Sequence, residues 1–120
     1  MKPIISEMDY KLLYDLLKSQ KTSQGKDLGQ EITNAKIVKD EDMDKKIIRL
    51  NSQVEVQEMA NGKKIKLKIV MPDCVDLKNH RISVFSPLSV ALIGYKENDL
   101  IPWTTTAGKT SFKIIKVLND

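Results

Sequence analysis

The spacing of apolar residues changes along this chain, and that change limits the folds open to it. Up to residue 38 apolar side chains recur every three or four positions, whereas from residue 53 onward they alternate with polar ones. The first spacing is typical of a helix with one buried face, and the second of a strand with one buried face. The sequence therefore predicts an α+β chain, with a helical part in residues 1–45 and a sheet domain in residues 46–120.

The helical part is predicted to be a short antiparallel helical hairpin. Two apolar stripes carry the prediction: Ile5, Met8, Leu12 and Leu16 with Leu13 and Leu17 beside them, then Leu28, Ile32 and Ala35. They place helices over about residues 7–20 and about residues 27–38, with Ser6 and Asp9 resembling a capping box at the first start. Two helices joined by a short loop bury their stripes only when they lie antiparallel. The charged residues 39–45 are expected to form a solvated linker.

The sheet domain is predicted to be a twisted antiparallel sheet with one short helix packed on it. Alternating or β-rich segments indicate strands at residues 53–57, 65–69, 81–85, 100–106 and 110–118. Asn61-Gly62 lies between the first two strands and is a strong hairpin signal. The adjacent Ile114 and Ile115 interrupt the alternation of the last strand, which suggests a β-bulge or burial on both faces.

The short helix is predicted to begin after Ser86. Serine is a favoured N-cap residue, and Pro87 follows at the first helical position, where proline is favoured. Leu88, Ala91 and Leu92 supply its apolar face, and Gly94 ends it. The segment before Ser86 is therefore expected to be a loop held at one end of the sheet.

Catalytic and metal-binding groups are scarce in this sequence. Its single histidine, His80, lies in a polar stretch and is predicted to be an exposed loop residue. His80 and the single cysteine, Cys74, supply too few ligands for a structural zinc site. Cys74 is predicted to be a small hydrophobic side chain near a strand end, and the scattered glycines form no phosphate-binding loop. No cofactor and no metal are expected.

Composition points to a cytoplasmic protein. A single cysteine cannot form an internal disulfide, which suits a reducing compartment. The first residues hold no apolar signal core, and no stretch approaches the roughly 18 apolar residues of a membrane span, so neither export nor a membrane partner is predicted. Residues 1–45 carry eight Lys against nine acidic residues, whereas residues 46–120 carry twelve Lys or Arg against seven. This excess is assigned to solubility, with an acidic partner or nearby nucleic acid as the alternative.

A row of three lysines lies on the second predicted strand: Lys64, Lys66 and Lys68. Such a row is usually a solvated sheet face that discourages edge pairing. Aromatic residues are sparse and form no stacking platform for single-stranded nucleic acid. Only an indirect proximity to nucleic acid is therefore expected.

Five short motifs in the sheet domain resemble the C-terminal domain of the GreA/GreB transcription factors. They are, in order, Asn51-Ser52 with Val54, Ile82 to Pro87 followed by Ala91 to Gly94, Asn98-Asp99, Ala107-Gly108, and Phe112 to Val117. Their order and spacing make the resemblance specific. Within the family, the shortened helical part and the charged linker before Leu50 are most similar to the Rnk type, called regulator of nucleoside diphosphate kinase. The resemblance implies an FKBP-like fold for residues 46–120.

The resemblance also implies binding to bacterial RNA polymerase beside its secondary channel. The preferred interpretation is a transcription regulator, a monomer and not an enzyme, that occupies the channel rim without transcript-cleavage activity. Phe85, Ser86 and Pro87 match the loop that docks onto this rim in the family. Phe85 is then either an exposed aromatic anchor of the interface or a residue of the core.

Two alternatives stay open. The first is a true transcript-cleavage factor that delivers a metal ion through the tip of its hairpin, where Asp27 and Glu31 would be the carboxylates. The family motif D-x-x-E is not kept, since Gln30 stands three residues after Asp27, and a helix of about 14 residues spans only about 21 Å. The second is a peptidyl-prolyl isomerase, because those enzymes share the fold class, but Trp103 and Phe112 alone hardly line a proline pocket.

Overall fold

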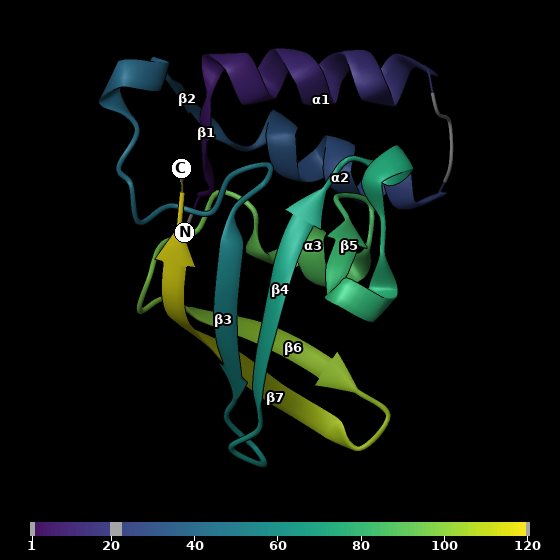
Figure 1. The fold of residues 1–120 in the computed structure, drawn as a ribbon, viewed down its shortest axis with the longest axis vertical. Helices are drawn as coiled ribbons and strands as arrows, with labels where there is room; N and C mark the ends of the chain where they lie inside the picture. The colour runs from purple at the N-terminus through teal and green to yellow at the C-terminus, as the bar shows by residue number, and fades with distance from the viewer. Residues whose placement is uncertain (1, 20–22, 120) are drawn as a thin grey trace.

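Figure 1 shows a layer of two helices lying across one end of a curled sheet. The computed structural model describes residues 2–19 and 23–119. Its helices are α1 (Glu7–Ser19), α2 (Ser23–Thr33) and α3 (Pro87–Leu92), with short 3-10 turns at Asp40–Asp42, Pro72–Cys74 and Leu77–Asn79. Its strands are β1 (Ile4–Ser6), β2 (Lys36–Val38), β3 (Gln53–Glu58), β4 (Lys64–Val70), β5 (Arg81–Ser83), β6 (Leu100–Thr105) and β7 (Gly108–Leu118). The architecture is therefore α+β, as predicted.

The first helix begins where the sequence predicts, but its buried face differs from the predicted stripe. The backbone N–H of Asp9 donates to the Ser6 hydroxyl oxygen at 3.2 Å, which is the hydrogen bond of an N-cap. Leu13 is fully buried, whereas Met8 and Leu12 are 61% and 45% exposed. The buried side includes the carboxylate of Asp9. An apolar pattern cannot indicate a face that contains a buried charge.

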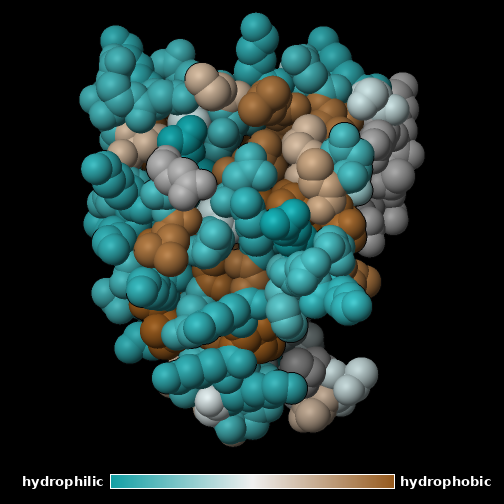
Figure 2. Space-filling view, viewed as in Figure 1, coloured by the Kyte–Doolittle hydropathy of each residue, from teal (hydrophilic) through white to brown (hydrophobic). Residues whose placement is uncertain are grey.

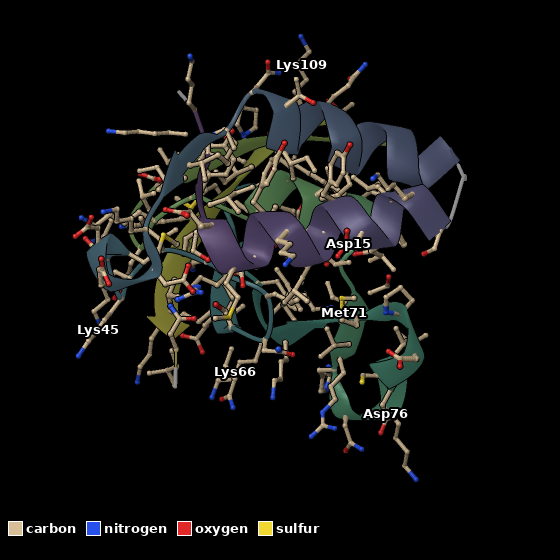
Figure 3. The ribbon with its side chains drawn as sticks, turned by 90° about the horizontal axis from the view of Figure 1, so that it is seen from above. Asp15, Lys45, Lys66, Met71, Asp76 and Lys109 are labelled. Carbon is tan, nitrogen blue, oxygen red and sulfur yellow. The ribbon has the colours of Figure 1, made fainter. Side chains whose placement is uncertain are left out.

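The second helix ends at Thr33 and does not reach residue 38 as predicted. The last predicted turn is instead β2, which pairs in parallel with β1. The N–H of Lys36 donates to the carbonyl oxygen of Pro3 at 2.8 Å, so strand pairing satisfies backbone groups that a helix would have satisfied internally. α1 and α2 lie side by side in Figures 1 and 3. The loop predicted between them falls on residues 20–22, outside the described residues.

The larger sheet has the strand order β5-β4-β3-β7-β6. The predicted bulge is confirmed: Glu55 pairs with Lys116 and Val56 pairs with Ile114, which leaves Ile115 as the extra residue of β7. β7 bends along its length in Figure 1, and the sheet curls with it. A bulge increases the local twist of a strand, so the doubled isoleucine contributes to the shape of the sheet.

One strand pair departs from the antiparallel prediction. β4 and β5 are parallel, with Lys68 opposite Arg81 and Val70 opposite Ser83. Residues 71–80 form the crossover that returns the chain to the start of this edge, as a parallel pair requires. The prediction of a wholly antiparallel sheet is therefore wrong for β5. The β3–β4 and β6–β7 hairpins are antiparallel as predicted.

The charged linker of residues 39–45 is docked at both ends. The N–H of Met8 donates to Asp40 Oδ1 at 3.0 Å. Near the other end, Lys96 Nζ lies 2.8 Å from Asp44 Oδ2, and the hydrogen bond from Lys96 lowers the pKa of the Asp44 carboxyl. The segment is polar as predicted, but it follows the surface through specific contacts.

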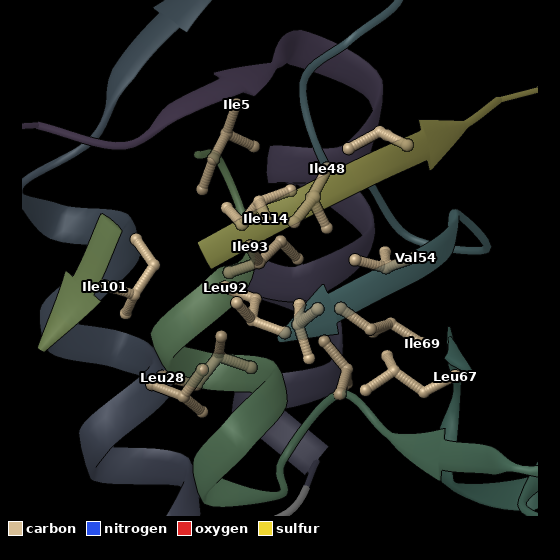
Figure 4. Packing of buried hydrophobic residues seen from close by; sticks show 14 of the residues in the cluster. Ile5, Leu28, Ile48, Val54, Leu67, Ile69, Leu92, Ile93, Ile101 and Ile114 are labelled. Atoms are coloured by element: carbon tan, nitrogen blue, oxygen red, sulfur yellow. The ribbon is translucent and has the colours of Figure 1, made fainter. Parts of the chain in front are cut away.

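A single hydrophobic core takes side chains from the helical part and from the sheet domain (Figure 4). The helical part contributes Ile5, Leu13, Leu28 and Ile32, and these pack with sheet and α3 residues that include Val56, Ile69, Leu92 and Ile114. The predicted division at residue 45 is thus crossed by shared packing. Among the described helices, none is long and apolar enough to cross a membrane.

Candidate functional site

The loop between β5 and α3 is held by hydrogen bonds on both sides. The N–H of Val84 donates to the Val70 carbonyl at 2.8 Å, and the N–H of Ser86 donates to the Ser83 carbonyl at 2.9 Å. The N–H of Phe85 donates to Ser83 Oγ at 3.0 Å. These bonds fix the chain where it leaves the sheet and turns into the helix.

Ser86 caps α3, as the sequence predicts. Its Oγ accepts the N–H of Ser89 at 3.2 Å and lies 2.9 Å from the Ser89 hydroxyl. Pro87 is the first residue of the helix and is exposed, whereas Ser86 is half-buried. Gly94 follows the helix at a φ of +87°, a conformation that glycine adopts without strain. The loop therefore presents Pro87 to solvent from a rigid base.

Phe85 belongs to the core. Its side chain is 5% exposed and packs within the main hydrophobic cluster. Of the two interpretations that the sequence left open, the exposed aromatic anchor is wrong for this structure, because the ring supports the loop from below. The assignment of Ser86 and Pro87 to polymerase docking stays a prediction.

A polar cluster joins the helical part to the sheet domain. Arg49 Nη2 donates to Ser6 Oγ at 2.9 Å and lies 3.5 Å from Asp40 Oδ2. Arg49 Nε donates to Asp9 Oδ2 at 3.3 Å, and the same oxygen accepts the N–H of Leu50 at 3.3 Å. The side chain of Asp9 is only 9% exposed. Since a buried carboxylate is costly without partners, this cluster fixes α1 on the sheet domain.

The cluster continues to Ser52, the serine of the first family-like motif. Ser52 Oγ accepts the N–H of Arg49 at 2.7 Å and donates to Asn119 Oδ1. The Asn119 amide donates to the carbonyls of Lys45 and Ile47 at 2.9 and 2.8 Å. The motif therefore marks a buried structural hydroxyl. The motif is visible in the sequence but the cluster is not, because residues of the cluster lie up to 74 positions apart.

The two carboxylates predicted at the hairpin tip are four residues apart on α2, which is about one helical turn. Glu31 lies eight residues after the first residue of α2, or about 12 Å along the helix axis. Burial raises the pKa of its carboxyl. Burial, then the charges of Glu31 and Asp99, raise the pKa of the Tyr95 hydroxyl. Ile32, the next residue of α2, is buried in the core that the helical part shares with the sheet domain. The side chain of Asp27 is outside the described part, and its role stays a prediction.

The remaining candidate residues form no catalytic arrangement in the described part of the chain. His80 is exposed, as predicted, and ends a 3-10 turn at a φ of 60°. Cys74 is exposed and is not packed as a small hydrophobic side chain, which corrects the prediction. Trp103 is half-buried and packs edge-on against Phe112, with 5.7 Å between ring centroids. No group of three or more His, Cys, Asp or Glu within residues 2–19 and 23–119 is placed to hold a metal ion.

A family match covers the linker end and the sheet domain, including the capped loop and the Ser52 cluster. Residues 43–119 match the family described as "Transcription elongation factor, GreA/GreB, C-term". The chain belongs to the GreA/GreB family. Sequence relatives include "Transcription elongation factor GreA" of Acetivibrio thermocellus, 31% identical over 72% of this chain and 54% of the relative. The protein of the same name from Christiangramia forsetii is 28% identical over 74% of this chain and 56% of the relative.

The chain spans about half the length of these GreA relatives. A solved structure described as "Prokaryotic transcription elongation factor GreA/GreB from Nitrosomonas europaea" matches the whole fold, with a TM-score of 0.81, 28% identity and 99% of both chains covered. Thermus thermophilus "GreA factor homolog 1" shares the fold at a TM-score of 0.51 and 17% identity, over 99% of this chain and all of its own.

The comparisons correct one expectation. The sequence had predicted a binding protein that is not an enzyme. The matched relatives carry the name "Transcription elongation factor GreA", and the resemblance associates that type of factor with transcript cleavage. The scarcity of catalytic groups in the sheet domain is therefore no ground for excluding an enzymatic role.

Proposed function

We propose that this chain is a transcription elongation regulator that binds bacterial RNA polymerase at the rim of its secondary channel. Membership of the GreA/GreB family carries the proposal. The capped loop before α3 is the contact that we assign to the rim, because it corresponds to the docking loop of the family. Ser86 holds this loop, and Pro87 is its exposed point.

The geometry of the loop suits a docking contact. A loop whose backbone is already fixed loses little conformational freedom on binding, so more of the interaction free energy remains as affinity. Phe85 fills the core beneath the loop, and the Ser86 cap holds the start of α3. The role of Phe85 in binding is thus to support the contact surface, and Pro87 makes the contact.

The helical part is the element that we propose to enter the channel. In this proposal α1 and α2 act as a short hairpin of the Rnk type, and residues 46–120 act as an FKBP-like docking domain. α1 has 13 residues, so it extends about 20 Å at 1.5 Å per residue. A factor of this size occupies the entrance of the channel and competes with other proteins that bind the same rim.

Binding to purified core polymerase, measured by biolayer interferometry, tests the docking loop. Pro87→Glu is expected to weaken binding at least about tenfold, because it places a charge at the centre of the contact. Glutamate at the first position of a helix is favourable to the helix dipole, so the fold is expected to stay intact. Met59→Glu, at an exposed residue near the β3–β4 turn, is the matched control. Equal weakening by both variants would remove the loop from the proposal.

Transcript cleavage is a second candidate function, favoured by the name that the matched relatives carry. In this candidate Asp27 supplies a carboxylate from the first half of α2 to a metal ion at the polymerase active site. Cleavage of a backtracked transcript in the presence of Mg²⁺ measures it directly. Stimulation that is lost in Asp27→Ala and kept in Asp15→Ala, an exposed carboxylate of α1, supports the candidate. If the protein binds the rim but does not stimulate transcript cleavage, the docking proposal stands and the cleavage candidate is excluded.

A further inference from the structure

The outer face of the larger sheet gathers six cationic side chains from three strands, β4, β5 and β7. They are Lys64, Lys66, Lys68, Arg81, Lys113 and Lys116, and we call this surface the basic face. The sequence showed only the β4 row of three lysines. The strand register adds the others: Arg81 lies opposite Lys68, and Lys116 lies opposite Glu55, which is itself paired with Lys66.

The cations form a two-dimensional array. Neighbouring strands lie about 4.8 Å apart, and residues on the same face of one strand lie about 6.7 Å apart. Lys66 and Lys116 therefore flank β3 in one row, and Lys68 and Arg81 begin the next. Glu55 is the single carboxylate among the described strand residues of this face, and its Oε2 lies 3.8 Å from Lys66 Nζ. The remaining charge of the face is uncompensated within the strands.

The basic face is hollowed. A depression of about 600 Å³ is lined by Lys66, Lys68, Arg81 and Lys116, together with His80 and Asn79 of the crossover. Figure 2 shows hydrophilic side chains extending across this side of the molecule. Figure 3 shows Lys66 projecting from it, away from Lys109 on the opposite side. A curved polyanion can thus touch several cations at once.

We propose that the basic face binds the phosphate backbone of duplex DNA. Neutralising several regularly spaced phosphates requires cations in an array and no further chemistry. An acidic protein segment would also need apolar anchor pockets to gain affinity, and the outward strand positions that line the depression are charged or amide residues, with Leu118 as the one apolar residue among them. A single strand would need aromatic side chains for base stacking, and the described strand residues of the face include none. The proposal does not depend on polymerase binding, since the loop at Pro87 is not part of the basic face.

Fluorescence anisotropy with a labelled 20-base-pair duplex, followed from about 50 to about 200 mM salt, tests the proposal. Four phosphate contacts predict a slope of about −3.6 in log K against log salt, which is a loss of affinity of about 150-fold over this range. The triple variant Lys68→Gln, Arg81→Gln, Lys116→Gln should flatten the slope to about −0.9, a loss of about fourfold. Glu55→Gln should strengthen binding at low salt, because it removes the opposing charge.

The matched control removes three exposed cations outside the larger sheet: Lys11→Gln, Lys36→Gln and Lys39→Gln. It should keep the slope of the wild type, and thermal melting should show that all variants are folded. Equal flattening in the control would overturn the proposal, since net charge and not this face would be responsible. Competition by polyglutamate at the same concentration of charge would reassign the face to an acidic polypeptide. Absence of duplex binding at 50 mM salt would also overturn the proposal, and it would leave polymerase docking unaffected.

Discussion

Phe85→Ala is expected to lower the free energy of unfolding by about 4 kcal/mol. The ring is 5% exposed and packs in the core beneath the docking loop. Truncation removes its buried apolar surface and leaves a cavity that rigid neighbours fill only in part. The loop is held by its hydrogen bonds to Ser83, which limits how far it can collapse into the space. Equilibrium unfolding in urea measures the change.

Tyr14→Ala is the matched control for an aromatic truncation. Tyr14 is 45% exposed, stacks on Tyr10 with 6.1 Å between ring centroids, and lies beneath Lys18. Its loss is expected to cost no more than about 1 kcal/mol. If Phe85→Ala unfolds at the urea concentration of the wild type and binds polymerase weakly, the ring is a contact residue and its assignment to the core is wrong.

Gly94→Ala is expected to lower the free energy of unfolding by about 3 kcal/mol. Gly94 has a φ of +87°, which costs about 1 kcal/mol for a residue with a Cβ. A Cβ at this position would lie 2.5 Å from Pro3 Cβ and 2.9 Å from the backbone nitrogen of Ile4. The carbonyl of Gly94 accepts the N–H of Ile4 at 2.8 Å, so relief of the clash would pull β1 away from the sheet domain.

Gly62→Ala separates the cost of the positive φ from the cost of the steric clash. Gly62 has a similar φ of +73°, and the nearest atom to an added Cβ is the side-chain nitrogen of Gln57 at 3.8 Å. This variant therefore carries the backbone strain without the clash and should lose about 1 kcal/mol. Thermal melting of the two variants measures the difference. Equal losses at Gly62 and Gly94 would show that the N-terminal strand is not packed closely on Gly94.

Features that depend on neighbours in the sequence could be predicted. The Ser86 cap, the Asn61-Gly62 hairpin and the bulge at Ile115 are each determined within a few residues. Turn and cap preferences act locally through hydrogen bonds and allowed backbone angles. The strands of the sheet domain could be predicted too, because the alternation of apolar and polar residues is also a local pattern.

Features that depend on distant partners could not be predicted. β2 was predicted as helix because its parallel partner, β1, lies about thirty positions earlier. Asp9 was not expected on the buried face of α1, because the partners of its carboxylate, Arg49 and the N–H of Leu50, lie about forty positions later in the chain. The basic face was seen as one row of lysines, because the register that adds Arg81 and Lys116 is a property of the folded sheet.

The sequence likewise predicted one part of the candidate site and left another part undecided. The order of motifs in residues 51–118 indicated the family, and the family match confirms it. The exposure of Phe85 could not be decided from the sequence, because a residue between a strand and a helix cap can face either side. The structure buries it and leaves Pro87 as the exposed residue of the loop.

Photo-crosslinking to core RNA polymerase shows which part of the polymerase lies against the docking loop. A photoreactive amino acid replacing Pro87 places the probe on the docking loop, and the same residue replacing Met59 places it near the β3–β4 turn. We expect the first probe to crosslink to polymerase segments at the rim of the secondary channel, and the second to give little crosslinking. Crosslinks from position 87 to another region of polymerase, or equal yields from both positions, would contradict the account.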